Sequence, residues 1–382
     1  MNNKWNVAFI TGSRADYGIV RRYLSLLDND SEIKLDIVVT GALLSDDYGH
    51  QVDLIYADGF RNIIEIPVEI NSSNNTCILH TMSQILDCFG SFFEANKYDL
   101  VIILGDRYEM LPVATAAAMH KIHILHLHGG EATFGNYDEF IRHSITKMSR
   151  FHFTATEEYR KRVIQLGEVP ENVFYLGALG AENCLSINEN NVSETVKALP
   201  EKKYFVVLFH PETLTNADVE QQTEELISVL RFFPQYMFVF IGSNADTYSN
   251  LIRKRIKEFV DKADNVRYFE NLHSDAYHYL VKHSVCLIGN SSSGIIEAPS
   301  LGVYSINIGE RQKGRTRGNS VVDVACNSEQ IRHAIEKVLK IHDCIKPENP
   351  YYKFNAANEY YRVTKSLLKK SESLEPKIFY DL

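Results

Sequence analysis

The chain has 382 residues, of which 45% are apolar, and its formal net charge at pH 7 is −9. A single hydrophobic core rarely grows beyond about 250 to 300 residues, so this length predicts two domains with a cleft between them. The acidic balance, without a long Lys/Arg block, argues against nucleic acid as a partner, and the lack of a signal-type or membrane-spanning apolar run predicts a cytoplasmic protein.

In the first half of the chain, short apolar runs alternate with longer amphipathic segments. This pattern is typical of βαβ units that stack into a parallel sheet with helices on both faces. We expect a Rossmann-like first domain over residues 1–187. Its predicted strands are Asn6–Ile10, Leu35–Thr40, Asn62–Pro67, Leu100–Leu104, Ile122–Leu127, Phe151–Ala155 and Val173–Leu176.

The second half repeats this pattern and predicts a second Rossmann-like domain over residues 204–353. Residues 188–203 are polar and end in Leu-Pro-Glu-Lys-Lys, so we place the domain linker there. Residues 354–382 include a helical segment that could pack back on the first domain. The predicted strands of the second half are Tyr204–Phe209, Phe238–Ile241, Val266–Tyr268, Val285–Ile288 and Tyr304–Ile308.

The loop after the first predicted strand reads TGSRADYG, and ligands bind beyond the carboxyl ends of strands in open parallel sheets. Gly12 permits a tight turn, the following helix presents free N–H groups, and Arg14 adds a cation. These features predict a diphosphate-binding loop. The alternative is an ordinary turn in which Ser13 caps the helix.

A carboxylate and a guanidinium follow the strand Leu100–Leu104 in the segment LGDRYE. We interpret Asp106 as a catalytic carboxylate and Arg107 as a contact to diphosphate or sugar. The alternative is that the two side chains only form an ion pair with each other, which on a loop contributes little stability.

Two histidines and a glutamate follow in the segment HLHGGE. His126 and His128 are two residues apart, so on a strand they would share a face and could point with Glu131 toward a zinc ion. We disfavour a metal because Glu131 follows a flexible Gly-Gly pair and nearby acidic groups suffice for acid–base chemistry. The six cysteines form no CxxC pair, which argues against a zinc knuckle or a disulfide framework.

A helix is predicted to begin in the segment NYDEF, close after these residues. Asn136 and Glu139 have the spacing of a capping box, which would make Glu139 structural. Asp138 would then face the cleft.

In the second half, the loop GNSSSG lies between a predicted strand and an apolar helix start. Gly289 lets the backbone approach a ligand closely, and Ser291 and Ser292 add hydroxyl donors at a helix start, which together predict phosphate binding. Glu297, one turn further on, could accept hydrogen bonds from a ribose. The alternative is a flexible surface turn.

Three further side chains follow strands of the second half. His210, in FHPET, would reach a ligand held between the domains, although a buried histidine with satisfied hydrogen bonds is the alternative. Asn244, in GSNAD, and Arg311, in the basic loop GERQKGR, are further candidates for substrate contact. A solvated surface turn is the alternative for the basic loop.

The chain contains neither a GxGxxG fingerprint with a downstream ribose acid nor a GxxxxGK[ST] loop, which disfavours dinucleotide oxidation and P-loop phosphoryl transfer. Eight segments instead resemble, in the same order, motifs of the hydrolysing UDP-N-acetylglucosamine 2-epimerases of the bacterial sialic-acid type. The resemblance spans Met1 to about Asp323. The segments are TGSRADYG, LGDRYE, HLHGGE, NYDEFIRHSITKMS, FHPET, GSNAD, GNSSSGIIEAPS and NIGERQKGR.

This resemblance implies a GT-B-like fold, in which two Rossmann-like domains close over a nucleotide-sugar. It implies that the enzyme needs no cofactor, releases UDP and inverts C2 of the sugar through a 2-acetamidoglucal, which gives N-acetylmannosamine. Family members are commonly homodimers or homotetramers, and we expect the same here.

The resemblance also implies roles for particular residues. Many relatives carry a glutamate proposed for catalysis where this chain has His128, so either His128 or the nearby Glu131 would take that role. The groups implied for acid–base chemistry or sugar contact are Asp106, Asp138 and His210, and those implied for nucleoside contact are Glu297 and Arg311.

Three alternatives stay open at the level of sequence. A GT-B glycosyltransferase would need an acceptor groove that the sequence neither shows nor excludes. A nucleotide-sugar sensor without turnover is disfavoured, because like charges that converge on a cleft cost stability unless chemistry uses them. The third alternative is the same reaction on UDP-2,4-diacetamido-trideoxyglucose, on the legionaminic acid route.

Overall fold

The computed structural model describes residues 4–46, 50–71, 73–134, 137–210, 219–242, 249–260, 263–270, 272–342, 346–371 and 376–382. The chain divides into two compact units: unit 1 comprises Met1–Ala132, Asn136–Leu179 and Lys353–Leu382, and unit 2 comprises Thr133–Gly135 and Gly180–Tyr352. Each unit is a parallel sheet covered by helices, which confirms the predicted fold class. Within the described ranges, no helix is long and apolar enough to span a lipid bilayer.

Unit 1 is built on a parallel sheet in which each predicted segment of the first half forms a strand. The described strands follow the order β3-β2-β1-β4-β5-β6-β7. The central strands are continuous apolar runs because both of their faces are buried. The strands are β1 (Trp5–Thr11), β2 (Ile33–Thr40), β3 (Ile63–Ile66), β4 (Leu100–Leu104), β5 (Ile124–Leu127), β6 (Phe151–Thr154) and β7 (Val173–Tyr175).

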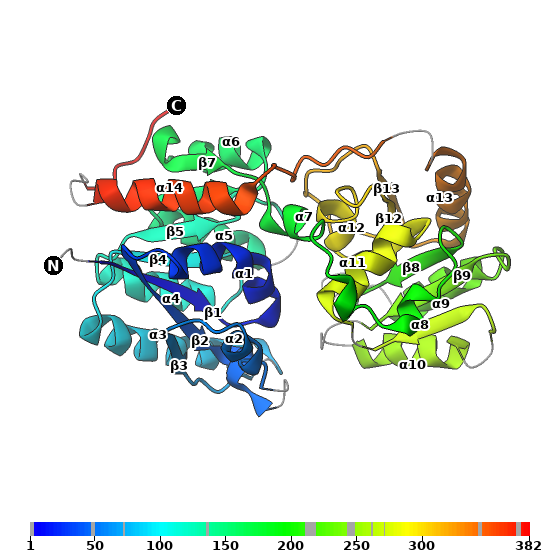
Figure 1. Cartoon of the computed structure of the whole chain (residues 1–382), viewed down its shortest axis with the longest axis horizontal. Helices are drawn as coiled ribbons and strands as arrows, with labels where there is room; N and C mark the ends of the chain where they lie inside the picture. Colours follow the sequence, from blue (N-terminus) through cyan, green and yellow to red (C-terminus); the bar gives the residue numbers. More distant parts are fainter. Residues whose placement is uncertain are drawn as a thin grey trace. The chain divides into compact units, whose positions relative to one another are not determined.

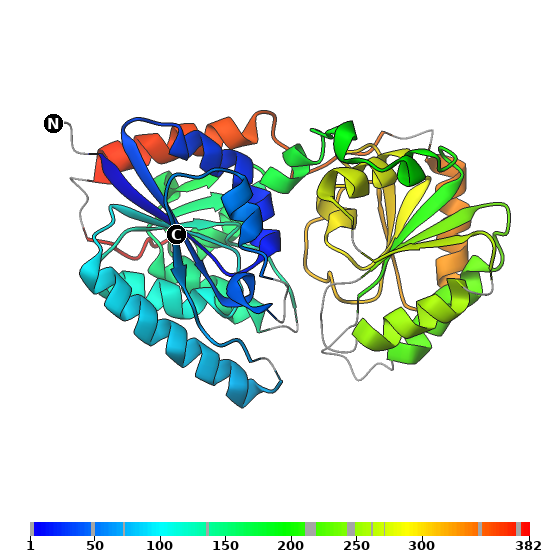
Figure 2. The same cartoon turned by 60° about the horizontal axis from the view of Figure 1, so that its bottom comes forward.

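Helices cover both faces of this sheet (Figures 1 and 2). They are α1 (Arg14–Asp28), η1 (Gly41–Leu44), α2 (Asp53–Ala57), α3 (Asn75–Ala95), α4 (Met110–Met119), α5 (Asp138–Met148), α6 (Glu157–Gln165), η3 (Pro170–Asn172) and α14 (Ala356–Ser371). On one face, Leu24 of α1 and Tyr360 of α14 belong to the same buried cluster. On the other face, Phe89 of α3 and Ile145 of α5 belong to a second cluster.

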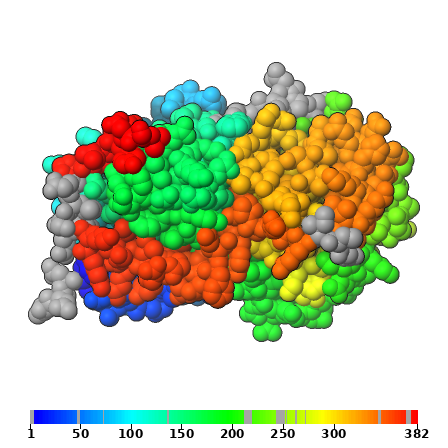
Figure 3. Space-filling view, turned by 90° about the horizontal axis from the view of Figure 1, so that it is seen from above, coloured from blue at the N-terminus to red at the C-terminus, as the bar shows by residue number. Residues whose placement is uncertain are grey.

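The C-terminal helix α14 is part of unit 1 although it follows unit 2 in the sequence. The hydroxyl of Tyr360 donates to the carbonyl oxygen of Gly177 at 2.7 Å, and Nζ of Lys365 donates to the carboxylate of Asp30 at 2.7 Å. Figure 3 shows this orange-red helix at the surface beside the green segment that contains α6 and β7. Residues 356–371 therefore complete one face of the first sheet.

Unit 2 contains a second parallel sheet, whose described strands follow the order β10-β9-β8-β11-β12-β13. Its edge strand β13 was not predicted, because its sequence VVDV is short and only partly buried. The strands are β8 (Tyr204–Leu208), β9 (Met237–Ile241), β10 (Val266–Phe269), β11 (Cys286–Gly289), β12 (Tyr304–Ile308) and β13 (Val321–Val324). The helices are α7 (Leu179–Asn183), η4 (Glu189–Asn191), α8 (Glu194–Lys197), α9 (Val219–Leu230), α10 (Ser249–Val260), α11 (Ser274–His283), α12 (Ser293–Ile296) and α13 (Ser328–Ile341).

Residues 188–203, predicted to be a linker, instead form η4 and α8 within unit 2. Val192 and Val196 are buried in a cluster with residues of β8 and α11. Leu199 packs against the same cluster, so apolar side chains anchor this largely polar segment. The boundary between the units lies earlier, within α7.

Candidate functional site

The carboxyl ends of three neighbouring strands bring together predicted residues of unit 1. Strands β1, β4 and β5 lie side by side in the sheet. The loops that leave them start at Gly12, Gly105 and His128. Parallel strands end at the same edge of a sheet, so these loops form one polar rim at the position where open α/β sheets bind ligands.

The first loop combines a helix cap with an exposed cation. Ser13 Oγ accepts from the backbone N–H of Asp16 at 3.2 Å and donates to the Asp16 carboxylate at 2.7 Å. Burial raises the pKa of Asp16, while nearby Arg107 opposes the increase. Arg14 is the first residue of α1 and its side chain is exposed. Ser13 is thus a cap, as the alternative interpretation stated, and Arg14 is accessible to an anion.

Arg142 of α5 is the organising residue of this rim, although no motif in the sequence pointed to it. Its guanidinium is only 1% exposed and forms an ion pair with Asp106. Its Nη1 donates to the backbone oxygen of Glu131 at 2.8 Å and to Glu139 at 3.2 Å. The predicted carboxylate Asp106 and the segment around Glu131 are therefore held by one buried cation. Glu139 binds Arg142 and His143 side chains, so its role is structural.

Asp106 and Arg107 do not pair with each other. Arg107 Nη2 donates instead to the buried carboxylate of Glu109 at 2.7 Å. Burial alone would lower the pKa of Arg107, but the carboxylates of Glu109 and Asp16 raise it. Arg107 keeps part of its side chain exposed at the rim, so it carries a fixed positive charge there.

His126 and His128 do not share a face, contrary to the expectation from strand alternation. Strand β5 ends at Leu127, and His128 has a φ of 63°, which breaks the alternation. His126 is fully buried, with Nε2 2.8 Å from the carbonyl oxygen of Gly105 and Nδ1 3.1 Å from the hydroxyl of Thr146. In the part of the chain that the structure describes, no three His, Cys, Asp or Glu side chains are grouped as metal ligands.

His128 lies beside Glu131 instead. Its Nδ1 is 4.0 Å from Glu131 Oε1, and both side chains are largely buried. The two residues between which the resemblance leaves one catalytic role open are thus neighbours, at a separation longer than a hydrogen bond.

Replacement of His126 should reduce the sensitivity of unfolding to acid. Burial lowers the pKa of His126 to about 3. Between about pH 6.5 and pH 3 the unfolded chain therefore binds a proton that the folded chain does not, and the free energy of unfolding falls as the pH drops, by about 1.4 kcal/mol per pH unit. Urea unfolding at about pH 7 and pH 5 should show that His126→Gln loses about 2 kcal/mol less than the wild type between these pH values.

The exposed His80 of α3 provides the matched control His80→Gln, for which we expect the wild-type pH dependence. Equal pH dependence of His126→Gln and the wild type would show that His126 is not held neutral by the fold.

In unit 2, His210 follows β8 and is joined to the end of β11. The backbone N–H of His210 donates to Asn290 Oδ1 at 2.7 Å, and Asn290 Nδ2 donates to the carbonyl oxygen of His210 at 2.8 Å. Arg311 Nη1 donates to the backbone oxygen of Asn290 at 3.0 Å. Burial lowers the pKa of His210 to about 3, and the charge of Arg311 adds to this effect. His210 is therefore a neutral imidazole at pH 7.

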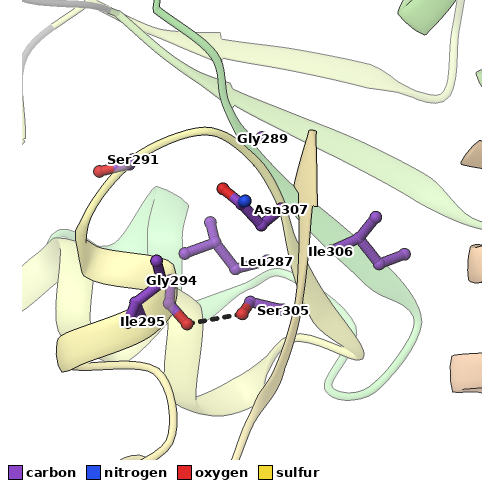
Figure 4. A pocket seen from close by; sticks show the side chains of 8 residues that line it. All are labelled: Leu287, Gly289, Ser291, Gly294, Ile295, Ser305, Ile306 and Asn307. Atoms are coloured by element: carbon purple, nitrogen blue, oxygen red, sulfur yellow. Dashed lines mark hydrogen bonds between the residues drawn. The ribbon is translucent and has the colours of Figure 1, made fainter. Parts of the chain in front are cut away.

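The serine-rich loop of unit 2 approaches β8 closely. Gly289 has a φ of 145°, and a Cβ at this position would overlap the carbonyl oxygen of Leu208. Figure 4 shows a small cavity behind the loop, with a hydrogen bond of 2.5 Å from Ser305 Oγ to the Gly294 carbonyl oxygen. The cavity measures about 10 Å³, which suits one water molecule and excludes a nucleotide. Ser291 and Ser292 are partly exposed, so a phosphate would meet the outer side of the loop.

Glu297 is held by side chains of α11 and of the loop. Ser293 Oγ donates to its Oε2 at 2.5 Å, and His278 Nε2 lies 3.5 Å from the same oxygen. Burial would raise the pKa of Glu297, but the interactions with His278 and Ser293 lower it. Glu297 is therefore an oriented carboxylate with part of its side chain exposed.

Two other predicted residues remain to be placed. Asp138 is the first residue of α5 and is partly exposed, one turn before Arg142. Asn244 lies outside the described residues, as does Asn136 of the predicted capping box.

Comparison with known proteins gives consistent matches over most of the chain. A family model described as UDP-N-acetylglucosamine 2-epimerase matches residues 25–365. The chain is 49% identical to polysialic acid biosynthesis protein P7 of Escherichia coli, over 98% of this chain and 97% of that protein. It is 35% identical to a GDP/UDP-N,N'-diacetylbacillosamine 2-epimerase (hydrolyzing) of Campylobacter jejuni, over 88% of each.

A solved structure shares the fold. The crystal structure of UDP-GlcNAc 2-epimerase from Neisseria meningitidis bound to UDP-GlcNAc matches with a TM-score of 0.71, over 95% of this chain and 100% of that chain. The sequences are 18% identical, so this likeness concerns the fold alone.

Proposed function

The chain belongs to the UDP-N-acetylglucosamine 2-epimerase family, and from this premise we propose that it is a hydrolysing 2-epimerase that converts UDP-N-acetylglucosamine and water to N-acetylmannosamine and UDP. The observation that carries the proposal is the set of groups held by buried Arg142 at the ends of β4 and β5, Asp106 among them. Such a rim can move protons on a sugar. The matched family model, described as UDP-N-acetylglucosamine 2-epimerase, supports this choice of substrate.

The chemistry requires elimination because C2 of the bound sugar adjoins an acetal carbon and no carbonyl acidifies its hydrogen. In the proposed first step, the bond between C1 and the diphosphate oxygen breaks, the electron pair leaves with UDP, and a base takes the proton from C2. The product is a 2-acetamidoglucal with a double bond between C1 and C2. Water then adds its oxygen to C1, and a proton returns to C2 on the opposite face, which inverts that carbon.

We assign one proton transfer to Asp106 and the other to the pair of His128 and Glu131. Asp106 keeps about a quarter of its side chain exposed beside Arg142, so it is accessible to a ligand. His128 and Glu131 are neighbours, with 4.0 Å between Nδ1 and Oε1, so either is placed to serve as the second group. Proton transfer by a positioned side chain contributes about 10²- to 10⁴-fold to the rate. Asp138 and His210 complete the groups that we propose to contact the sugar.

The remaining predicted residues would bind the UDP moiety. Positive charge for the diphosphate would come from Arg14, Arg107 and Arg311. These side chains would stabilise the negative charge that develops on the diphosphate oxygen as its bond to C1 breaks. Gly289, Ser291 and Ser292 provide the loop against which it rests, and Glu297 would accept from the ribose. Asn244 is proposed from the sequence pattern only.

The product suggests a place in sialic acid biosynthesis for capsule or surface glycans, and the Escherichia coli relative named for polysialic acid biosynthesis supports this assignment. We further propose that the protein acts in the cytoplasm as a homodimer or homotetramer and needs no cofactor. A second candidate substrate is UDP-2,4-diacetamido-trideoxyglucose, because the Campylobacter jejuni relative acts on a diacetamido sugar by name.

Proton NMR of the purified protein with UDP-N-acetylglucosamine in D₂O tests the proposal. We expect UDP and N-acetylmannosamine to appear together, with deuterium at C2, because the proton returned to C2 comes from solvent. Turnover of the diacetamido sugar alone would identify the second substrate. Binding of UDP without conversion of either sugar would reject the epimerase and favour a glycosyltransferase or a sensor.

A further inference from the structure

Asn290 joins the loops that follow three neighbouring strands of unit 2. Strands β8, β11 and β12 are adjacent in the sheet, and Asn290 is the first residue after β11. Its side chain binds the backbone of His210, which follows β8. Its backbone oxygen accepts from the side chains of Arg311 and Gln312, both at 3.0 Å. Arg311 and Gln312 belong to the loop that follows β12.

The side chain of Asn290 replaces strand pairing where the sheet ends. The paired positions of β8 and β11 run up to Leu208 and Gly289, and His210 and Asn290 follow them directly. The Asn290 amide accepts from the N–H of His210 and donates to its C=O, as a second peptide group would. A carboxylate of the same shape could accept but not donate, and alanine could do neither.

This contact is buried and tightly defined. Asn290 is 0% exposed and His210 is 6% exposed. The positive φ of Gly289 brings the end of β11 against Leu208, at the distance from which the amide reaches His210. Because the backbone N–H and C=O of His210 are both held, the direction of its Cα–Cβ bond, from which the imidazole extends, is fixed.

We propose that Asn290 is a positioning residue, which aligns the His210 imidazole with the substrate through the reciprocal contact between its amide and the His210 backbone. The inference rests on the proposed function of His210 and adds a residue to it. Because Ser291 of the proposed phosphate loop is the next residue, Asn290 also sets the imidazole and the phosphate loop relative to each other.

The test is a double-mutant cycle with separate measurements of turnover and UDP affinity. In Asn290→Ala, kcat should fall by about 10²-fold, the size of effect expected from a small misplacement of a reacting group. The Kd of UDP should change by less than about threefold, because Arg311 and Gln312 bind the backbone oxygen of Asn290, which the substitution keeps. In a His210→Ala background, Asn290→Ala should lower kcat no further.

Two further variants separate positioning from folding. Asn290→Asp keeps the acceptor for the His210 N–H and the side-chain shape, so its kcat should lie between those of Asn290→Ala and the wild type. Asn265→Ala is the matched control, because Asn265 Nδ2 also donates to a backbone carbonyl oxygen, that of Tyr236 at 2.9 Å. This contact lies at the amino ends of β9 and β10, at the far end of the strands from Asn290. We expect wild-type kcat for this control.

Wild-type kcat in Asn290→Ala, or additive losses in the double mutant, would overturn the inference. Equal kcat in Asn290→Asp and Asn290→Ala would also overturn it, because the accepting oxygen would then be without effect. If the wild-type protein converts no nucleotide-sugar, the proposed function fails and this inference falls with it. That outcome is distinct because it appears before any substitution is made.

Discussion

Replacement of Asp106 with asparagine should lower kcat by about 10²- to 10⁴-fold and leave UDP affinity nearly unchanged. The amide has the shape of the carboxylate and can still accept from Arg142, so the rim around β4 and β5 should keep its geometry. It cannot take up a proton from C2. The rate of UDP release measures turnover, and titration calorimetry with UDP measures binding.

Asp99 provides the control for this prediction. Its carboxylate accepts from the backbone N–H of Asn6 at 2.7 Å at the amino end of β4, away from the rim. Asp99→Asn should therefore turn over at the wild-type rate. Wild-type rates in Asp106→Asn would remove Asp106 from the chemistry, and a parallel loss of UDP affinity would make it a binding group instead.

Replacement of Arg142 with methionine should lower the free energy of unfolding by about 3 to 5 kcal/mol, the cost of removing one partner of a buried ion pair. The guanidinium is 1% exposed and serves Asp106, Glu139 and the Glu131 backbone. Methionine fills the space but donates nothing, so these acceptors lose their shared donor. Urea unfolding followed by circular dichroism measures the loss, and turnover should fall with it because Asp106 is no longer held.

The control for this prediction is Arg362→Met, the same substitution at an exposed arginine. Its side chain is 69% exposed and pairs with Glu359 on α14, and an ion pair so exposed contributes little stability. Arg362→Met should therefore unfold close to the wild type. Arg142→Lys keeps the charge but not the planar fork, so we expect it to recover only part of the stability. Equal stability of Arg142→Met and Arg362→Met would contradict the organising role of Arg142.

Much of the fold could be predicted from the sequence because parallel strands buried on both faces are continuous apolar runs. Each predicted strand is present, and the polar residues directly after the strands pointed to the rim of unit 1 and to the loops after β8, β11 and β12 of unit 2. The edge strand β13 escaped prediction because half-exposed VVDV, placed among polar residues, lacks this signal.

The partners within this rim and these loops could not be predicted in the same way. Asp106 and Arg142 are 36 residues apart, and helical spacing shows only that Arg142 shares a face with Asp138 and Glu139. Nothing in that spacing indicates that Arg142 is buried. Asn290 and His210 are 80 residues apart, and the amide of Asn290 was hidden within a serine-rich motif.

The two histidines of HLHGGE illustrate a different limit. Alternation along β5 predicted that His126 and His128 share a face, but the strand ends between them and His128 takes a positive φ. Backbone conformation at a strand end depends on the neighbouring loops. The alternation of residues along a strand therefore does not predict where the strand ends or which φ the next residue adopts.

The return of α14 to unit 1 has a consequence for the order in which the protein matures on the ribosome. Tyr360 and Leu367 of α14 fill the same buried cluster as Leu24 of α1, so one face of the first sheet is only partly covered until residues 356–371 have emerged. By then residues 180–352 have already been synthesised as one continuous stretch. Nascent chains usually fold from the amino end, but here translation favours closure of unit 2 first.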